Sequence, residues 1–123
     1  MIDEAYGDYM NPKNSAINLI YKYENLVVSK TFSKAYGLSG IRIGYGFGHE
    51  DLIGNLTKVK LPFEPGLIAQ MGALGAIYDK PHLRRTLVNN QRRYNETFAF
   101  LTKHKFNPIQ SAANFIAFKT GSE

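Results

Sequence analysis

The sequence has 123 residues, of which 44% are hydrophobic and 13% aromatic, enough apolar material for one domain with a packed core. It contains no cysteine, which excludes disulfides and thiolate metal sites. No apolar run approaches the length of a membrane span, and Met1 is followed by Asp3 and Glu4 rather than by a basic and apolar leader. We therefore expect a cytoplasmic protein with no membrane partner.

The net charge of +5 is concentrated in one segment. Residues 80–105 hold seven of the 15 lysines and arginines and a single acidic residue, Glu96. A basic helix can bind nucleic acid by neutralising phosphates, so one interpretation is a polyanion-binding module that uses Arg84, Arg85, Arg92 and Arg93. A solvated helix face explains the same pattern more simply, and we expect no nucleic-acid partner.

Hydrophobic periodicity and turn residues predict a chain of strands and helices. In order, we expect a clipped strand end at residues 1–2, a loop over 3–9, a polar connector with Asn11 and Pro12, a strand near 26–29, a second strand over 41–47, a short helix around 52–56 that ends before Pro62, a helix over 67–78, a longer helix over 81–105, and a last strand over 114–120. Glycine and alanine in the 67–78 helix favour close backbone packing. The apolar stripe of the longer helix, from Leu83 to Leu101, predicts a contact with the core.

Two patterns invite functional interpretations that their spacing does not support. The glycines of GYGFG, residues 44–48, lack the GxGxxG spacing of a dinucleotide site and lie within a strand-like alternation. The acidic clusters at residues 3–8 and 49–51 lack a recognised spacing of cation ligands. The sequence therefore predicts neither a dinucleotide fingerprint nor a metal site.

Lys34 lies in a short joint between the two predicted strands. A nucleophilic lysine must be held at a defined position with its amine partly deprotonated, and flanking strands supply the position. Thr31 and Ser33 add hydroxyls beside it, and Arg42 adds a fork of donors suited to a phosphate. These groups fit a phosphorylated aldehyde, although on composition alone a surface lysine that follows a strand is the favoured interpretation.

Three motifs carry a resemblance to a known family. The segment SKTFSKAYGLSGIRIGYGFG, residues 29–48, resembles the cofactor-attachment segment of fold-type I pyridoxal-phosphate aminotransferases, and it is closest to their histidinol-phosphate aminotransferase branch. Upstream, IDEAYGDY is similar to the family's Asp-Glu-Ala-Tyr motif, and downstream, SAANFIAF is similar to its Ser-x-x-Asn-Phe segment. The three motifs occur in the family's order and together reach across nearly the whole chain.

The resemblance implies pyridoxal 5'-phosphate as the cofactor. Lys34, the catalytic residue, would bind the cofactor's aldehyde covalently and then carry a proton between the substrate α-carbon and the cofactor. Asp3 would face the pyridine nitrogen, and Tyr6 would donate its hydroxyl to the ring oxygen. The residues that would bind the cofactor phosphate are Thr31, Ser33 and Arg42. Substrate-binding residues are not assigned.

The resemblance also implies an α/β fold, namely part of the large domain of a fold-type I aminotransferase, with a mostly parallel sheet and helices, plus the start of the small domain. Residues 1–80 would belong to the cofactor-binding large domain, 81–105 would form an interdomain helix, and 106–123 would begin the small C-terminal domain. The expected reaction is amino transfer between a small-molecule amino donor and a 2-oxo acid. Histidinol phosphate and 2-oxoglutarate are the favoured pair, other amino acids stay open as donors, and related decarboxylases and synthases share the lysine segment. Because full-length members are several times longer, we expect a segment of a homodimeric enzyme that is inactive by itself, with a non-catalytic remnant as the alternative.

Overall fold

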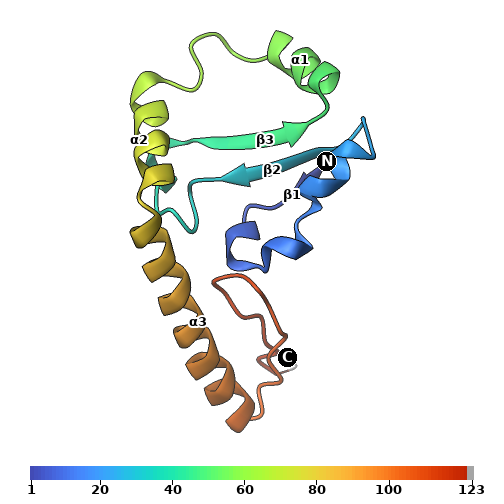
Figure 1. The fold of residues 1–123 in the computed structure, drawn as a ribbon. Helices are drawn as coiled ribbons and strands as arrows, with labels where there is room; N and C mark the ends of the chain where they lie inside the picture. The colour runs from blue at the N-terminus through green and yellow to red at the C-terminus, as the bar shows by residue number, and fades with distance from the viewer. Residues whose placement is uncertain (122–123) are drawn as a thin grey trace.

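A computed structural model describes residues 1–121, which form a three-stranded sheet, three α-helices and short 3-10 turns (Figure 1). The strands are β1 (Ile2–Asp3), β2 (Val27–Thr31) and β3 (Gly44–Gly48), and the helices are α1 (Glu50–Lys58), α2 (Leu67–Tyr78) and α3 (Lys80–Lys103). The predicted α/β class is confirmed. The end of the predicted small-domain segment, residues 122–123, lies outside the described residues.

The sheet is mixed and has the strand order β1-β2-β3. β1 and β2 are parallel, and Asp3 is paired with Ser29. β2 and β3 are antiparallel, and Thr31 is paired with Gly44. The expected parallel pairing therefore holds for β1 and β2, but the antiparallel β3 makes the described sheet mixed rather than mostly parallel. The joint between β2 and β3, residues 32–43, contains one short 3-10 turn and no crossover helix, so the chain returns beside β2 in the opposite direction.

Two predicted strands differ from the structure. The second strand begins at Gly44 rather than at residue 41, because Arg42 has left-handed dihedral angles, φ 51° and ψ 61°, which interrupt the extended backbone. The predicted strand over 114–120 is wrong. This segment makes one isolated bridge, between Ile109 and Ala117, and forms no ladder with any described strand. A strand persists only where a neighbouring backbone satisfies its hydrogen-bonding groups.

The loop and connector that precede β2 are built from 3-10 turns, at Gly7–Tyr9, Pro12–Asn14 and Ala16–Tyr21. Asn11 and Ser15 begin the second and third turns, since each side-chain oxygen accepts a hydrogen bond from the main-chain amide two residues later. These turns bring the segment back beside the sheet, where the third turn contacts β2 and β3 (Figure 1).

The small residues of α2 face the rest of the protein. Ala69 and Ala73 are 8% and 6% exposed, whereas the large Ile68 is 82% exposed. A Cβ added to Gly72 would lie 2.7 Å from Cδ1 of Ile41, so the helix backbone approaches the joint closely. The predicted close backbone packing of this helix is confirmed.

The apolar stripe of α3 faces inward, as predicted, and Leu101 at its end is buried. The C-terminal segment, residues 106–121, runs back beside α3 (Figure 1). One hydrogen bond that joins them runs from the main-chain N–H of Ser111 to the Tyr94 hydroxyl, at 2.9 Å. The arginines predicted to lie on a solvated helix face are exposed.

Gly44 lies where β3 passes close to the main chain of β2, and alanine there is expected to destabilise the protein. A Cβ added to Gly44 would lie 2.6 Å from the main-chain oxygen of Lys30, which cannot move without separating the strands. We expect Gly44→Ala to lower the free energy of unfolding by about 1–3 kcal/mol, as overpacking does. Urea denaturation followed by circular dichroism measures this change.

Gly46→Ala is the matched control in the same strand. The nearest atom to a Cβ at Gly46 would be 3.6 Å away, an ordinary contact, so we expect unchanged or slightly higher stability. Equal losses of stability in the two variants would contradict the strand geometry.

Candidate active site

The predicted site residues gather at the carboxyl ends of the two parallel strands. β1 ends at Asp3 and β2 ends at Thr31, and Lys34 follows β2 by three residues. Loops at the carboxyl edge of parallel strands are where α/β proteins commonly bind ligands. The strand ends therefore bring Asp3 and the lysine joint to one edge of the sheet.

The glycines of β3 leave one face of this sheet uncovered. Asp3, Ser29 and Gly46 lie side by side on that face, because Ser29 is the registered partner of both other residues. Thr31 and its partner Gly44 follow two positions along the same face. Since glycine has no side chain, β3 places nothing over the Asp3 and Thr31 side chains. The alternating glycines thus shape the face beside the site and are not a phosphate-binding loop.

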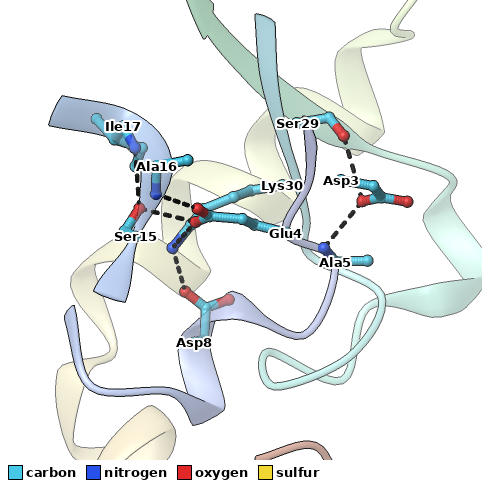
Figure 2. A network of polar contacts seen from close by, with 9 residues as sticks. All are labelled: Asp3, Glu4, Ala5, Asp8, Ser15, Ala16, Ile17, Ser29 and Lys30. Carbon is cyan, nitrogen blue, oxygen red and sulfur yellow. Dashed lines mark hydrogen bonds and ion pairs between the residues drawn. The ribbon is translucent and has the colours of Figure 1, made fainter. Parts of the chain in front are cut away.

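The Asp3 carboxylate is oriented through one of its two oxygens. Oδ1 accepts hydrogen bonds from the main-chain N–H of Ala5, at 2.9 Å, and from the Ser29 hydroxyl, at 3.2 Å (Figure 2). Within residues 1–121, Oδ2 accepts no hydrogen bond. The side chain is exposed, so Oδ2 is available to a cationic N–H donor from a ligand.

The Lys34 amine lies over the ring of Tyr6, with Nζ 5.2 Å from the ring centroid. The negative face of an aromatic ring attracts a cation at this distance. Lys34 is exposed, and Nζ forms no salt bridge with any residue that the structure describes. The Lys34 carbonyl accepts a hydrogen bond from Gly37, whose φ of +75° favours glycine in this turn. The structure therefore brings Lys34 and Tyr6 together and leaves the amine accessible.

A hydrogen bond connects Thr31 and Ser33, whereas the Arg42 side chain bonds to a different residue. The Thr31 hydroxyl accepts a hydrogen bond from the main-chain N–H of Ser33, at 3.1 Å, and lies 3.5 Å from the carbonyl oxygen of Ile43. The neighbouring Arg42 is exposed, and its guanidinium donates to the carbonyl of Ser39, at 2.6 Å. The guanidinium therefore bonds within its own loop and makes no hydrogen bond to Thr31 or Ser33.

A buried ion cluster lies on the opposite face of β2, and the sequence analysis did not identify it. Lys30 Nζ is 3.2 Å from Asp8 Oδ1 and 4.0 Å from Glu4 Oε2 (Figure 2). The Glu4 carboxylate, 6% exposed, also accepts hydrogen bonds from the Ser15 hydroxyl and the Ala16 main-chain N–H. Two of the acidic residues at positions 3–8, Glu4 and Asp8, thus contact an ammonium group.

One signal in the sequence could have indicated this cluster. Lys30 alternates with Ser29 and Thr31 along β2, so its side chain must lie on the face opposite to theirs. A lysine directed into the protein from a strand requires a carboxylate partner. Of the three acids near the end of the neighbouring strand, Asp3 is paired with Ser29, which leaves Glu4 and Asp8 as partners for Lys30.

Aromatic rings pack beside the cluster on the same side of the sheet. Tyr45, the registered partner of Lys30, has its ring centroid 5.1 Å from that of Phe32, and Phe32 in turn is 4.9 Å from Tyr36. Burial raises the pKa of the Tyr45 and Tyr36 hydroxyls, and the negative charge of Asp8 raises both pKa values further. These hydroxyls are therefore neutral at physiological pH.

The free polar groups at the edge fit a phosphorylated aldehyde. Lys34 offers an exposed primary amine, Asp3 offers an unoccupied carboxylate oxygen, and the Ser33 hydroxyl has no hydrogen-bond partner among residues 1–121. An amine adds to an aldehyde, a carboxylate pairs with a protonated ring nitrogen, and hydroxyls bind phosphate oxygens. This donor set agrees with the pyridoxal phosphate expected from the resemblance.

The helices and the acidic and histidine side chains of the described part of the chain bear on membrane and metal binding. None of its helices is both long and apolar enough to cross a membrane. Its histidine, aspartate and glutamate side chains form no group of three that could hold a metal ion.

Comparison with known proteins identifies one family. The sequence model of the family described as aminotransferase class I and II matches residues 1–123. Among curated proteins, the chain is similar to histidinol-phosphate aminotransferase 1 of Bacillus anthracis, with 39% identity over 98% of this chain and 33% of the relative. It is also similar to histidinol-phosphate aminotransferase 2 of Nitrosospira multiformis, with 35% identity over 97% of this chain and 31% of the relative. The chain thus spans about a third of the length of these relatives.

Solved structures agree with the sequence comparison. The structure of histidinol-phosphate aminotransferase from Sinorhizobium meliloti in complex with pyridoxal-5'-phosphate aligns with a TM-score of 0.88 and 27% identity, over 98% of this chain and 33% of that chain. A histidinol-phosphate aminotransferase structure from Clostridium acetobutylicum aligns with a TM-score of 0.80 at 23% identity, over 97% of this chain and 37% of that chain, and supports the fold.

Proposed function

The chain belongs to the class I and II aminotransferase family, and from that premise we propose that it is the cofactor-lysine segment of a pyridoxal-phosphate-dependent transaminase. The observation that carries this proposal is the position of Lys34, whose exposed amine lies 5.2 Å from the Tyr6 ring. Both residues flank the sheet edge at which Asp3 keeps one oxygen free.

Six residues would hold the cofactor. Lys34 would bind its aldehyde carbon covalently, and Tyr6 would donate a hydrogen bond to its ring oxygen. Asp3 Oδ2 would accept a hydrogen bond from the N–H of the pyridine nitrogen. Because a neighbouring carboxylate favours the protonated, cationic ring, Asp3 would keep the proton on that nitrogen. The phosphate would be bound by Thr31, Ser33 and Arg42, with Arg42 turning away from the Ser39 carbonyl that it now contacts.

The chemistry divides between the cofactor and the lysine. When bound, pyridoxal phosphate withdraws electrons from the substrate α-carbon and so stabilises the negative charge left when a proton departs. The Lys34 amine, once released by the incoming substrate amine, would take that proton from the substrate α-carbon and deliver it to the C4′ carbon of the cofactor. The exposed position of Lys34 on a short turn allows its long side chain to make this movement.

We propose histidinol phosphate as the amino donor and 2-oxoglutarate as the acceptor. The support is the similarity of the whole chain to proteins named histidinol-phosphate aminotransferase, at 35–39% identity. The 123 residues correspond to about a third of those proteins, so we also propose that the chain alone does not turn over substrate.

The predicted division of the chain is part of the proposal. Residues 1–80 would contribute to the large domain, α3 would connect the domains, and residues 106–123 would begin the small domain. The packing of the C-terminal segment along α3 supports this division, since Asn90 and Tyr94 of the helix both contact it. The homodimer expected for the full-length enzyme stays a prediction.

The test uses the purified chain and a chimera in which it replaces the matching third of the Bacillus anthracis relative. Each protein is supplied with pyridoxal phosphate, histidinol phosphate and 2-oxoglutarate, and glutamate formation is measured. We expect turnover by the chimera, and none by the chain alone above a Lys34→Ala control, because a substrate that is not held in position forfeits about 7–11 kcal/mol of barrier lowering. Turnover by the chain alone would overturn the proposed inactivity, and a folded chimera that binds the cofactor yet transfers no amino group would overturn the proposed reaction.

A further inference from the structure

We propose that Ser29 is a positioning residue for Asp3, and that its hydroxyl fixes the carboxylate so that Oδ2 is kept for the pyridine N–H. This inference rests on the proposed function. None of the three family motifs assigns a role to Ser29, which enters only through its contact with Asp3 in the structure.

The register of the sheet places the two side chains together. Asp3 and Ser29 are paired across the parallel strands, and the main-chain N–H of Glu4 donates to the Ser29 carbonyl at 2.8 Å. The Ser29 hydroxyl then donates to Asp3 Oδ1 at 3.2 Å. The main chain and the side chain of Ser29 therefore both form hydrogen bonds with the end of β1, where the Asp3 carboxylate lies.

The orientation of the carboxylate depends on both donors to Oδ1. Asp3 is exposed, and apart from the Ala5 N–H, which approaches the same oxygen, no other hydrogen-bond donor contacts it in residues 1–121. A carboxylate held by one donor retains rotation about its last bond. A second donor from a different strand restricts that rotation and directs the free oxygen away from both donors.

The side chains beside Ser29 do not compete with Asp3 for its hydroxyl. Its partner on β3 is Gly46, which has no side chain, and Thr31, two residues along the same face, is engaged with Ser33 and Ile43. Asp3 Oδ1 is the acceptor that the structure gives for the Ser29 hydroxyl.

The test compares Ser29→Thr with Ser29→Val in the 123-residue chain loaded with pyridoxal phosphate. These side chains have the same shape, suit a strand equally, and differ in the hydroxyl. We expect Ser29→Thr to bind pyridoxal phosphate as the unaltered chain does, and Ser29→Val to show a dissociation constant about 3- to 10-fold higher, as the loss of one hydrogen bond to a charged group predicts.

A second readout reports on orientation directly. Nitrogen NMR of cofactor labelled at the ring nitrogen should show a smaller protonated fraction in Ser29→Val than in Ser29→Thr, because the carboxylate is less well directed at that nitrogen. A purely structural role would not move this signal. If Ser29→Val does not fold, Ser29→Ala compared with the unaltered chain replaces it.

The outcomes separate this inference from the proposed function. Borohydride should fix the cofactor to Lys34 in all variants, and its failure to do so in the unaltered chain would overturn the proposed function. Normal fixation at Lys34 with equal affinity and equal ring-nitrogen protonation in Ser29→Thr and Ser29→Val would overturn the role of Ser29 alone.

Discussion

Lys30→Met is expected to lower the free energy of unfolding by about 3–5 kcal/mol, as the removal of one partner from a buried ion pair does. The Lys30 side chain is 13% exposed, and the carboxylates of Glu4 and Asp8 around it are 5% and 12% exposed. Without the ammonium group, two carboxylates stay in a poorly solvated site with no opposite charge. We expect the loss of the ammonium group to affect Asp8 more than Glu4, because Asp8 Oδ2 is buried and has no hydrogen-bond partner in the described part of the chain. Urea denaturation followed by circular dichroism measures the change.

Two further variants make the interpretation of Lys30→Met specific. Arg93→Met removes a salt bridge to Glu96 whose side chains are 66% and 53% exposed, and we expect a loss below about 1 kcal/mol. Lys30→Met combined with Asp8→Asn removes one of the two unpaired charges and should regain part of the stability. If Lys30→Met were no more destabilising than Arg93→Met, the cluster would not be an energetically important part of the fold.

Lys34→Ala is expected to reduce turnover of the chimera by about 1000-fold or more, because it would remove both the proposed covalent attachment point and the group proposed to transfer the proton. Stability should change little, since Lys34 is exposed and its turn is formed by main-chain atoms. Lys58→Ala is the matched control, because Lys58 is also exposed and its amine contacts the nearby Asn55 within α1. Initial rates of glutamate formation measure both variants, and comparable rates in the two would remove Lys34 from the catalytic role.

Local pattern was sufficient for the helices and for the first long strand. The predicted helix over 67–78 coincides with α2, because its apolar periodicity and the preceding Pro65 and Gly66 are local signals. The strand over 114–120 shows the limit of this reasoning. Its sequence has the apolar and β-branched residues of a strand, but a strand also requires a partner, and Ile109 supplies a single bridge.

The motifs indicated candidate site residues, but they did not indicate the contacts that orient those residues. Lys34, Tyr6 and Asp3 were identified from short segments, and the structure places the Lys34 amine over the Tyr6 ring. The Ser29 contact to Asp3 joins residues 26 positions apart, and it depends on the register of β1 with β2. Such a register is set by tertiary packing, so neither this contact nor the Lys30 cluster is visible in a linear pattern.

The identity of the cofactor lysine is the central claim, and one measurement tests it directly. The chain is incubated with pyridoxal phosphate and reduced with borohydride, and the modified peptides are identified by mass spectrometry. We predict that the cofactor is fixed at Lys34, because its amine is exposed and stands over Tyr6 at the edge where Asp3 lies. Lys30 should be protected by its two carboxylates, and Lys58 and Lys60 should react only weakly as surface amines. Comparable modification of Lys34, Lys58 and Lys60 would contradict the account.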